Sequence, residues 1–309
     1  MKLDIILPTF NREDLLDRAL RSLFAAPIPA GLDVTVVVVD NNSKDGTRNL
    51  VEAWQKKVNE RLQYLFESKQ GKSQCLNTGI AATKGDLIGM IDDDEEIDVN
   101  WYATVEEAFR DPTLDFIGGP CLPRWEIPAP AWLPMDHPGV IGWIDGGDKV
   151  LAYGGEYQGI LMGGNAVLRR KLMETVGPYC TSLGPTGKRI MLGDDQDMFE
   201  RIMAAKGRGL YLPNLIIYHY VPATRLTKRY FRRWCFWNGV SLGLIDRQRR
   251  TPVVYFAGVP RWLYGRAVRS LAGIGADLFR RNRESSAMFS KELKLWDLAG
   301  FFHGKHFHR

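Results

Sequence analysis

The 309-residue sequence has no long uncharged hydrophobic segment. A helix that spans a bilayer needs about 20 consecutive apolar residues, and the nearest approach, residues 251–279, is interrupted by Arg261, Arg266 and Arg269. The apolar run at the N-terminus, Leu3–Leu7, is too short for the core of a signal peptide. We therefore expect a cytoplasmic protein without a membrane span, and we leave peripheral contact with the inner face of the membrane open.

Cysteines are few and widely spaced. Cys75, Cys121, Cys180 and Cys235 form no CxxC pair, so their spacing favours neither a zinc site nor a redox-active disulfide. Reduced thiols, as in the cytosol, are the simplest expectation. With 45 % hydrophobic and 25 % charged residues the composition is that of a folded globular protein, which argues against intrinsic disorder.

Acidic residues are scarce in the last quarter of the chain. Residues 221–309 hold 18 Lys and Arg against 5 Asp and Glu, whereas the whole chain holds 41 against 36. An acidic body followed by a basic segment predicts that the segment contacts an anionic partner, either a membrane surface or a nucleic acid. A solvated cationic face without a partner is the alternative.

Strand and helix patterns alternate through the first hundred residues. Short apolar runs predict strands over residues 3–7, 34–39, 62–66 and 86–91, and apolar residues at helical spacing predict helices over 13–24, 45–57 and 73–82. This order predicts an α/β fold with a mostly parallel sheet and helices on both faces. Right-handed crossovers then place the carboxyl ends of the strands at one edge, where ligands bind.

The remaining sequence is less regular. Residues 118–157 are rich in Pro, Gly and Trp and predict long loops, which are usually functional in a folded domain. Helices are expected over 168–175 and 195–205, a strand over 210–217 and a basic aromatic helix over 226–242. We therefore predict two domains, an α/β domain over residues 1–220 and a helical basic extension over residues 221–309.

Polar clusters follow three of the expected strands, at residues 8–12, 40–43 and 92–95. The cluster of Asp92, Asp93 and Asp94 brings three carboxylates together, which is costly in a buried site without a cation. Oxygen ligands at a strand end suit Mg²⁺ or Mn²⁺ bound jointly with phosphates. In an extended backbone Asp92 and Asp94 would point to the same side. A solvated acidic loop is the alternative.

Six segments, in their order and spacing, resemble the inverting family-2 glycosyltransferases, which have the GT-A fold. The segments are PTFNR (8–12), VVVDNNSKDGT (37–47), GKSQCLNTGIAATKGD (71–86), IDDDEE (91–96), GGNAVLRR (163–170) and GDDQDMFERI (193–202). Each segment alone is a weak signal. The resemblance covers about residues 1–240 and implies a Rossmann-like sheet that binds a nucleotide-sugar donor.

The resemblance implies a donor site at the ends of the strands. Its donor-binding residues would be Pro8, Thr9, Asn11, Arg12, Asp40, Asn42, Lys72, Asn77, Asp92 and Asp93. Asp40 would accept a hydrogen bond from a uracil-like N–H, which favours a UDP-sugar. Asp94 and Asp92 would hold Mn²⁺ or Mg²⁺ against the diphosphate. Leu76 stands where many relatives have Arg, which leaves the identity of the base open, with Lys69 or Lys72 as replacement cations.

His219 is a further candidate metal ligand, because related enzymes with this fold use a histidine near this position. A lone histidine between two tyrosines, Tyr218 and Tyr220, is more often structural, so both roles remain open.

The acceptor side rests on Asp194 and Asp195. An inverting reaction needs one carboxylate to deprotonate the acceptor hydroxyl, and Asp195 matches the family's general base. Asp194, at the start of the expected helix, is favoured as its N-cap, where the helix dipole stabilises negative charge. Gly164 and Asn165 would approach the donor sugar or the acceptor, with a tight turn as the alternative. Trp125 is a further candidate for acceptor contact.

The basic segment over residues 221–309 gives an indication of the acceptor. Arg232-Arg233-Trp234 lacks the Gln of the QxxRW motif that processive relatives carry before their membrane spans, so transfer of a single sugar is expected. Basic and aromatic residues alternate through 228–237, as in a helix that lies on an anionic bilayer. This pattern would fit a lipid-linked or cell-envelope glycan as acceptor.

Two other function classes remain at this point. A sugar nucleotidyltransferase would also need a carboxylate-bound metal, but it normally has a glycine-rich, lysine-bearing first loop, which residues 8–12 are not. A non-catalytic nucleic-acid-binding protein that uses the basic tail is less favoured, because it leaves both acidic clusters unexplained.

Overall fold

The computed structural model describes residues 1–186, 192–248, 252–279 and 286–307. The chain divides into two units. The first comprises Met1–Pro123, Trp143–Arg189 and Asp194–Tyr220, and the second comprises Arg124–Gly142, Ile190–Gly193 and Val221–Arg309. The last segment of the second unit begins at Val221, and Arg124–Gly142 adds part of the Pro- and Trp-rich region to it. The division into two domains at residue 220 remains a prediction.

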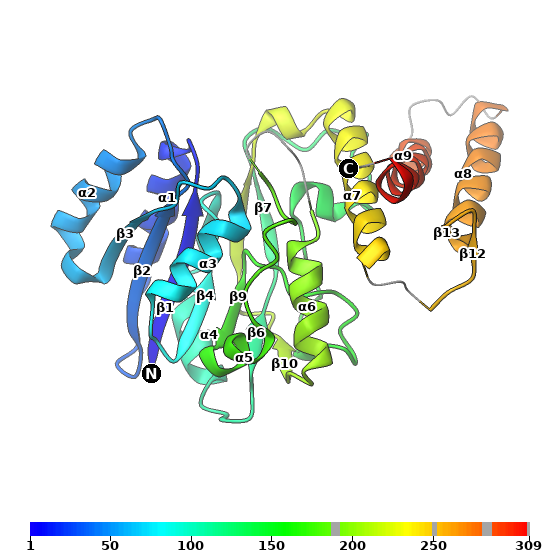
Figure 1. Cartoon of the computed structure of the whole chain (residues 1–309). Helices are drawn as coiled ribbons and strands as arrows, with labels where there is room; N and C mark the ends of the chain where they lie inside the picture. Colours follow the sequence, from blue (N-terminus) through cyan, green and yellow to red (C-terminus); the bar gives the residue numbers. More distant parts are fainter. Residues whose placement is uncertain (187–191, 249–251, 280–285, 308–309) are drawn as a thin grey trace. The chain divides into compact units, whose positions relative to one another are not determined.

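An eight-stranded sheet of order β3-β2-β1-β4-β9-β6-β10-β8 forms the centre of the first unit (Figure 1). Its strands are β1 (Lys2–Thr9), β2 (Asp33–Asp40), β3 (Leu62–Phe66), β4 (Leu87–Met90), β6 (Phe116–Gly118), β8 (Leu151–Ala152), β9 (Ala166–Arg169) and β10 (Gly209–Tyr211). Neighbours pair in parallel from β3 to β4 and between β6 and β10, whereas β9 and β8 run antiparallel to their neighbours. The predicted mostly parallel α/β sheet is confirmed.

Helices cover both faces of this sheet (Figure 1). They are α1 (Glu13–Ala25), α2 (Thr47–Val58), α3 (Lys72–Ala82), α4 (Trp101–Ala108), α5 (Arg170–Val176) and α6 (Asp194–Ala204). Leu3, Ile5 and Leu7 of β1 pack with α1, α2 and α4, whereas Ile6 packs on the other face with α3, α5 and α6. The alternation follows from the two-residue repeat of a strand, and it fixes which face each neighbouring side chain meets.

Two elements differ from the sequence expectation. The helix predicted over 168–175 begins at Arg170, because Ala166–Arg169 are drawn into the sheet as β9 between β4 and β6. The strand predicted over 210–217 is two strands, β10 and β11 (Ile217–Val221), separated by a turn at Pro213, which lacks the N–H that a strand would need. β11 joins β5 (Glu95–Ile97) and β7 (Cys121–Trp125) in a second sheet of order β5-β11-β7.

The second unit is built on α7 (Lys228–Gln248), α8 (Arg261–Phe279) and α9 (Ser286–His306), with a short hairpin of β12 (Tyr255–Phe256) and β13 (Val259–Pro260) before α8. α7 continues past residue 242, where the sequence pattern suggested an end. Within residues 1–186, 192–248, 252–279 and 286–307, no helix is long and apolar enough to cross a membrane.

α7 and α9 lie backbone against backbone. Glycines stand at four-residue spacing in both helices, at 239 and 243 in α7 and at 300 and 304 in α9. A Cβ atom on Gly300 would collide with the carbonyl oxygen of Phe236, and one on Gly304 would collide with that of Val240. Small residues at this spacing allow two helices to approach more closely than side chains otherwise permit.

Candidate active site

The acidic turn (Asp92–Glu95) lies directly after β4 and is largely buried. Asp93, Asp94 and Glu95 are between 5 and 7 % exposed. The backbone turns here, with Glu95 N–H donating to the carbonyl of Asp92 at 3.2 Å. The expectation of an extended backbone is therefore wrong. Asp92 pairs with one cation, whereas Asp93 and Asp94 share another.

Arg12, just after β1, neutralises two of these carboxylates. Its Nη1 lies 2.8 Å from Asp93 Oδ1 and 3.1 Å from Asp94 Oδ2. The hydroxyl of Thr9, the last residue of β1, donates to Asp93 Oδ2 at 2.9 Å. Burial, opposed by Arg12 and reinforced by Asp94, raises the pKa of Asp93 to about 6. Asp93 thus ties the first strand end to the acidic turn.

Asp92 pairs with a different cation. Its Oδ2 lies 2.6 Å from Nζ of Lys72, the first residue of α3. Burial alone would lower the pKa of Lys72, but Asp92, Asp195 and Asp194 together hold that pKa well above its usual value. The Lys72 ammonium group therefore interacts electrostatically with carboxylates of both the acidic turn and the start of α6.

His219 faces Asp94 from the second sheet. Its Nε2 lies 3.5 Å from Asp94 Oδ2, and the backbone N–H of Tyr220 donates to the Asp94 carbonyl at 2.8 Å. The antiparallel pairing of β11 with β5, in which His219 lies opposite Glu95, fixes this position. The histidine is 7 % exposed, so it is held in place next to a carboxylate.

The pair of Asp94 and His219 fits a divalent cation in part. Two ligand atoms 3.5 Å apart can both contact one ion, and an oxygen and an imidazole nitrogen suit Mn²⁺. No group of three or more His, Cys, Asp or Glu side chains is placed to hold a metal within the described part of the chain. Two protein ligands are nevertheless the usual number for an ion that is also bound by substrate phosphates.

Glu95 is a site residue that sequence reasoning did not identify. Its Oε2 accepts a hydrogen bond from the Asp92 backbone N–H at 2.8 Å. Burial, followed by the charges of Asp92 and Asp94, raises the pKa of Glu95 well above its usual value. Gly164 lies against this carboxylate, and a Cβ atom there would collide with Glu95 Oε1. Gly164 therefore makes room for Glu95, which its glycine identity alone did not reveal.

The acceptor-side carboxylates lie at the start of α6. Asp194 is the first residue of the helix and Asp195 the second, so Asp194 lies in the first turn and Gly193 precedes it. Burial and the charge of Asp195 raise the pKa of Asp194 to about 7, against the opposing effect of Lys72. Burial also raises the pKa of Asp195; Lys72 opposes this shift and Asp92 adds to it.

One oxygen of Asp195 has no well-aligned hydrogen bond. Asp195 Oδ1 is buried without such a partner among the residues that the structure describes, although the backbone N–H of Gly163 is close enough to lower the pKa of Asp195. This oxygen lies next to Gly163, where a Cβ atom would collide with it. A buried carboxylate oxygen without a well-aligned hydrogen bond is costly, and such groups are typical of sites that gain their partner from a ligand.

Two asparagines that are predicted to bind ligand, Asn165 and Asn77, hold loops together through their side-chain amides. The side chain of Asn165 accepts from Trp101 Nε1 and donates to the carbonyls of Pro120 and Leu215. Asn77 exchanges two hydrogen bonds with the backbone of Tyr179. Asn165 is 1 % exposed. Each amide group holds loops together, and a contact of either asparagine with a donor or an acceptor remains a prediction.

The expected base-binding residues lie at the ends of β1 and β2. Pro8 is buried in β1, and Asn11 accepts a hydrogen bond from the backbone N–H of Lys44 at 2.7 Å. Asp40 accepts from the Tyr64 hydroxyl at 2.8 Å and from the Ser43 N–H at 2.9 Å. The side chain of Asn42 accepts from Lys44 Nζ at 2.7 Å. Asn11, Asp40 and Asn42 thus shape the loop after β2.

Asn41 has a role that the sequence did not reveal. Its side chain donates to the carbonyls of Glu67 and Lys69 and accepts from the Gly71 N–H at 2.8 Å. Gly71 has φ of 142°, a conformation that favours glycine. Asn41 therefore positions the loop that leads into Lys72.

Trp125 ends β7 and belongs to the second unit. The expected contact of Trp125 with an acceptor remains a prediction.

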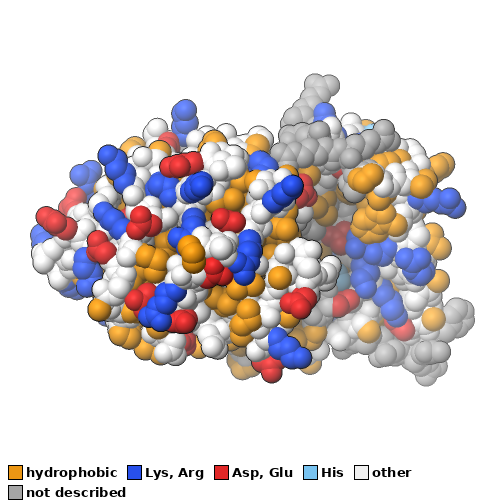
Figure 2. Space-filling view, turned by 90° about the horizontal axis from the view of Figure 1, so that it is seen from below, with side chains coloured by type: hydrophobic (Ala, Val, Ile, Leu, Met, Phe, Trp, Pro, Cys, Tyr) orange, Lys and Arg blue, Asp and Glu red, His pale blue; other side chains and the backbone are white. Residues whose placement is uncertain are grey.

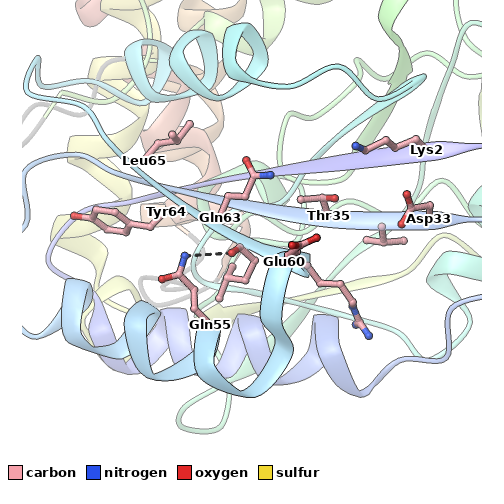
Figure 3. Close-up of a pocket in the computed structure, with 11 residues that line it drawn as sticks. Lys2, Asp33, Thr35, Gln55, Glu60, Gln63, Tyr64 and Leu65 are labelled. Atoms are coloured by element: carbon pink, nitrogen blue, oxygen red, sulfur yellow. Dashed lines mark hydrogen bonds between the residues drawn. The ribbon is translucent and has the colours of Figure 1, made fainter.

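A hollow of about 710 Å³ lies elsewhere in the first unit, over β1, β2 and β3 beside α2 (Figure 3). Its wall includes Lys2 and Asp33, the first residues of β1 and β2, and Gln55, which donates to the Leu62 carbonyl. The acidic turn and α6 do not line it. Its wall on β3 extends to Tyr64 and Leu65, and the Tyr64 hydroxyl donates to Asp40 at the carboxyl end of β2.

Comparison with known proteins assigns the family. The model of glycosyl transferase family 2 matches residues 4–177, more than half of the chain. The chain belongs to this family. The matched segment runs from β1 to α5 and includes Thr9 and the acidic turn. The predicted family and the predicted enzyme class, a glycosyltransferase, are therefore confirmed.

Several relatives are similar to this glycosyltransferase. The succinoglycan biosynthesis protein ExoM of Rhizobium meliloti is 27 % identical over 240 residues, which cover 75 % of this chain and 72 % of that protein. A glucosyl-dolichyl phosphate glucuronosyltransferase of Haloferax volcanii is 23 % identical over 80 % of this chain and 78 % of its own length. A GalNAc(5)-diNAcBac-PP-undecaprenol β-1,3-glucosyltransferase of Campylobacter jejuni is 35 % identical over 98 residues, 31 % of this chain and 30 % of its own.

A solved structure has the same fold. The mannosyltransferase PcManGT from Pyrobaculum calidifontis, in complex with GDP-Man and Mn²⁺, superposes with a TM-score of 0.65 over 98 % of this chain and 86 % of its own. At 19 % identity the likeness shows the fold, and it confirms the predicted GT-A architecture.

Proposed function

We propose that this glycosyltransferase uses a divalent metal to transfer a single sugar, with inversion, from a nucleotide-diphosphate donor to a hydroxyl acceptor. One observation carries the proposal. Lys72 pairs with Asp92 of the acidic turn and interacts electrostatically with Asp194 and Asp195 of α6. A displacement needs carboxylates in two places, where the diphosphate departs and where the acceptor is deprotonated. Both sets of carboxylates therefore lie in one small region around Lys72.

Asp94 and His219 would hold the metal, with the donor diphosphate supplying further ligands. The ion, Mn²⁺ or Mg²⁺, supplies positive charge that stabilises the departing nucleoside diphosphate. Arg12 neutralises Asp94 and Asp93 in the metal-free protein. A bound cation would take over this role, and the Arg12 guanidinium would then contact a phosphate. The Mn²⁺ in the structure of the Pyrobaculum enzyme supports this assignment.

Asp195 would be the general base. Its Oδ1 is buried without a well-aligned hydrogen bond among the described residues, so it has room to accept one from an acceptor hydroxyl. Its raised pKa makes it a stronger base than an exposed aspartate, as proton abstraction near neutral pH requires. Asp194, with a pKa of about 7, would tune this base from the neighbouring position.

A UDP-sugar is the favoured donor, because Asp40 lies at the end of β2 with two carboxylate oxygens, each of which can accept more than one hydrogen bond. The base is open to test, since the Pyrobaculum enzyme was solved with GDP-Man. Thermal unfolding with UDP or GDP, each with and without Mn²⁺, is the direct comparison. Stabilisation follows from binding to the native state, and UDP with Mn²⁺ should give the larger shift.

A lipid-linked or cell-envelope glycan is the proposed acceptor, at the cytoplasmic face of a membrane. The names of the relatives from Campylobacter and Haloferax include an undecaprenol diphosphate and a dolichyl phosphate. The four cysteines are free in the structure, as is usual in the cytosol. The basic C-terminal segment suits an anionic membrane surface. A screen of nucleotide sugars for hydrolysis, followed by transfer to lipid-phosphate acceptors, tests donor and acceptor in turn.

A further inference from the structure

Exposed large hydrophobic side chains are concentrated in the C-terminal part of the second unit. Of the 17 in the described chain, 10 lie between residues 252 and 307. The most exposed include Val254 (68 %), Phe256 (67 %) and Val268 (65 %). Single exposed apolar side chains are ordinary, but a concentration of them indicates an interaction surface.

α8 holds four of these ten side chains, Trp262, Val268, Leu271 and Leu278. Eight of its residues are exposed; six of these are apolar, and the two charged ones, Arg261 and Arg269, are both basic. Leu263, Ala267 and Ser270 form its buried side. Val268, Leu271 and Leu278 recur at intervals of three and seven residues and form one apolar stripe on the exposed side. A helix that faces water would carry charges of both signs there.

The charges that α8 does place toward the interior are paired. Asp277 binds Lys291 Nζ at 2.6 Å, and Arg266 lies 3.3 Å from Asp297 and over the ring of Trp262. The exposed side of α8 is thus left with a net positive charge around its apolar stripe.

The hairpin before α8 extends the stripe. The ring of Phe256 in β12 contacts that of Tyr264 in α8, with centroids 5.8 Å apart. His306 at the end of α9 lies 3.0 Å from the Ala257 carbonyl and contacts Phe302. On the face seen in Figure 2, hydrophobic and basic side chains adjoin over the helices of this unit.

The helix that the sequence pattern suggested for this role is a different one. The aromatic residues of α7 are largely used inside the second unit. Phe231 is fully buried and packs against Trp132 and Phe289, and Phe236 packs against Trp296. Arg232 pairs with Glu292 at 2.6 Å. The prediction that helix 226–242 itself lies on a bilayer is therefore not supported by its packing.

We propose that the β12–β13 hairpin and the exposed side of α8 form a membrane-docking surface that inserts into the interfacial region of an anionic bilayer. Aliphatic side chains would enter the acyl boundary, while Trp262, Arg261 and Arg269 would lie at the level of the headgroups. This inference rests on the proposed function in one respect: access to a membrane-bound acceptor is the biological role of the docking surface. It predicts binding to lipid whether or not the donor has been identified.

Two other partners fit less well. A symmetric pair of chains would bring the same patch together, with Arg261 and Arg269 of both copies meeting like charges. A nucleic acid would be bound through basic residues interleaved with stacking aromatic rings, whereas the stripe on α8 is aliphatic. Charge and side-chain type together favour an anionic lipid surface.

Flotation of the full-length protein with vesicles tests the proposal. Vesicles of phosphatidylcholine with about 30 % phosphatidylglycerol should carry the protein at low salt, and vesicles of phosphatidylcholine alone should carry much less. The triple substitution Val268→Gln, Leu271→Gln and Leu278→Gln should lower the bound fraction roughly tenfold or more. Glutamine is a good helix former, so α8 should persist, which circular dichroism and thermal unfolding check.

Matched controls isolate the surface. Val99→Gln with Val150→Gln changes two side chains that are 57 and 55 % exposed in the first unit and should float like the wild type. Arg261→Gln with Arg269→Gln should weaken binding to anionic vesicles, whereas Arg48→Gln with Arg110→Gln, two exposed arginines of the first unit, should not. Donor hydrolysis without vesicles should be unchanged in all these variants.

Three results would overturn the proposal. They are a wild-type protein that does not float with anionic vesicles at low salt, a triple variant that floats as well as the wild type, and a wild-type dimer that the triple substitution converts to monomer without any lipid binding. A protein that floats by this surface but hydrolyses no nucleotide sugar would instead count against the proposed donor chemistry and leave the docking surface standing.

Discussion

Nε2 of His219 lies 3.5 Å from Oδ2 of Asp94, and both side chains are less than a tenth exposed. His219 lies in β11 and Asp94 in the turn between β4 and β5, and the pairing of β11 with β5 brings these two distant segments together. If this pair holds the metal, His219→Ala should raise the Mn²⁺ concentration needed for stabilisation by a nucleoside diphosphate roughly tenfold or more. Asp94→Asn should abolish the part of this stabilisation that depends on Mn²⁺.

The measurement is a Mn²⁺ titration of the unfolding temperature at fixed nucleoside diphosphate. His137→Ala serves as the control, because His137 lies beside Asp136 in the second unit. Equal midpoints for His219→Ala and the wild type would remove His219 from the metal site.

Lys72 should matter far more than its neighbour Lys69. Lys72→Met removes the cation that pairs with Asp92 and interacts with Asp194 and Asp195, so transfer should fall on the order of 100-fold or more. Lys69 is exposed on the same loop, and Lys69→Met should change transfer by less than about threefold. Steady-state rates at saturating donor compare the two, and an equal loss in both variants would contradict the central position of Lys72.

Asp194 should make the metal-free enzyme less stable as pH rises. Its pKa is about 7 in the folded protein against a usual value of 3.8, so the folded state favours the neutral acid. This stabilisation is complete below about pH 4 and is lost as pH rises through about 7. Asp194→Asn keeps the shape without the charge, so the variant should unfold at a higher temperature than the wild type at pH 8.5 and at a similar one at pH 4. A variant that is less stable than the wild type at pH 8.5 would count against this burial cost.

The glycine contact between α7 and α9 should tolerate no side chain. Gly300→Ala would place a Cβ atom into the backbone of Phe236 and should cost about 1–3 kcal/mol of unfolding free energy. Gly275 is also helical, but nothing lies within 4 Å of its Cβ position, so Gly275→Ala should be neutral or stabilise by up to about 1 kcal/mol. Urea unfolding of both variants measures the difference, and similar stabilities would show that the helices can move apart.

The sequence predicted the parts of the site that follow from strand order. Apolar runs that end in Thr9, Asp40 and Asp92 place those residues at one edge of a parallel sheet, and the structure has them there. Local patterns carry this information, because a strand's period and its end are written in consecutive residues.

The parts that were missed depend on contacts between distant residues. Asn165 looked available to a sugar, yet its partners Trp101 and Leu215 are 64 and 50 residues away along the chain. The backbone turns at Asp92–Glu95 where an extended strand end was expected, and the run of acidic residues gave no sign of this turn. Similarly, the aromatic residues of α7 resemble a membrane face in sequence, whereas Phe231 and Phe236 pack against Phe289 and Trp296 of α9.

Asp195→Asn tests the central claim most directly, since it separates donor binding from proton abstraction. The substitution keeps the size of the side chain but removes the base, so nucleotide-sugar binding in the presence of Mn²⁺ should change by less than about threefold while transfer falls by roughly 10²- to 10⁴-fold. Isothermal titration and a transfer assay on the same preparation give both values. Transfer within about tenfold of the wild type would contradict the assignment of Asp195 as the base on which this account depends.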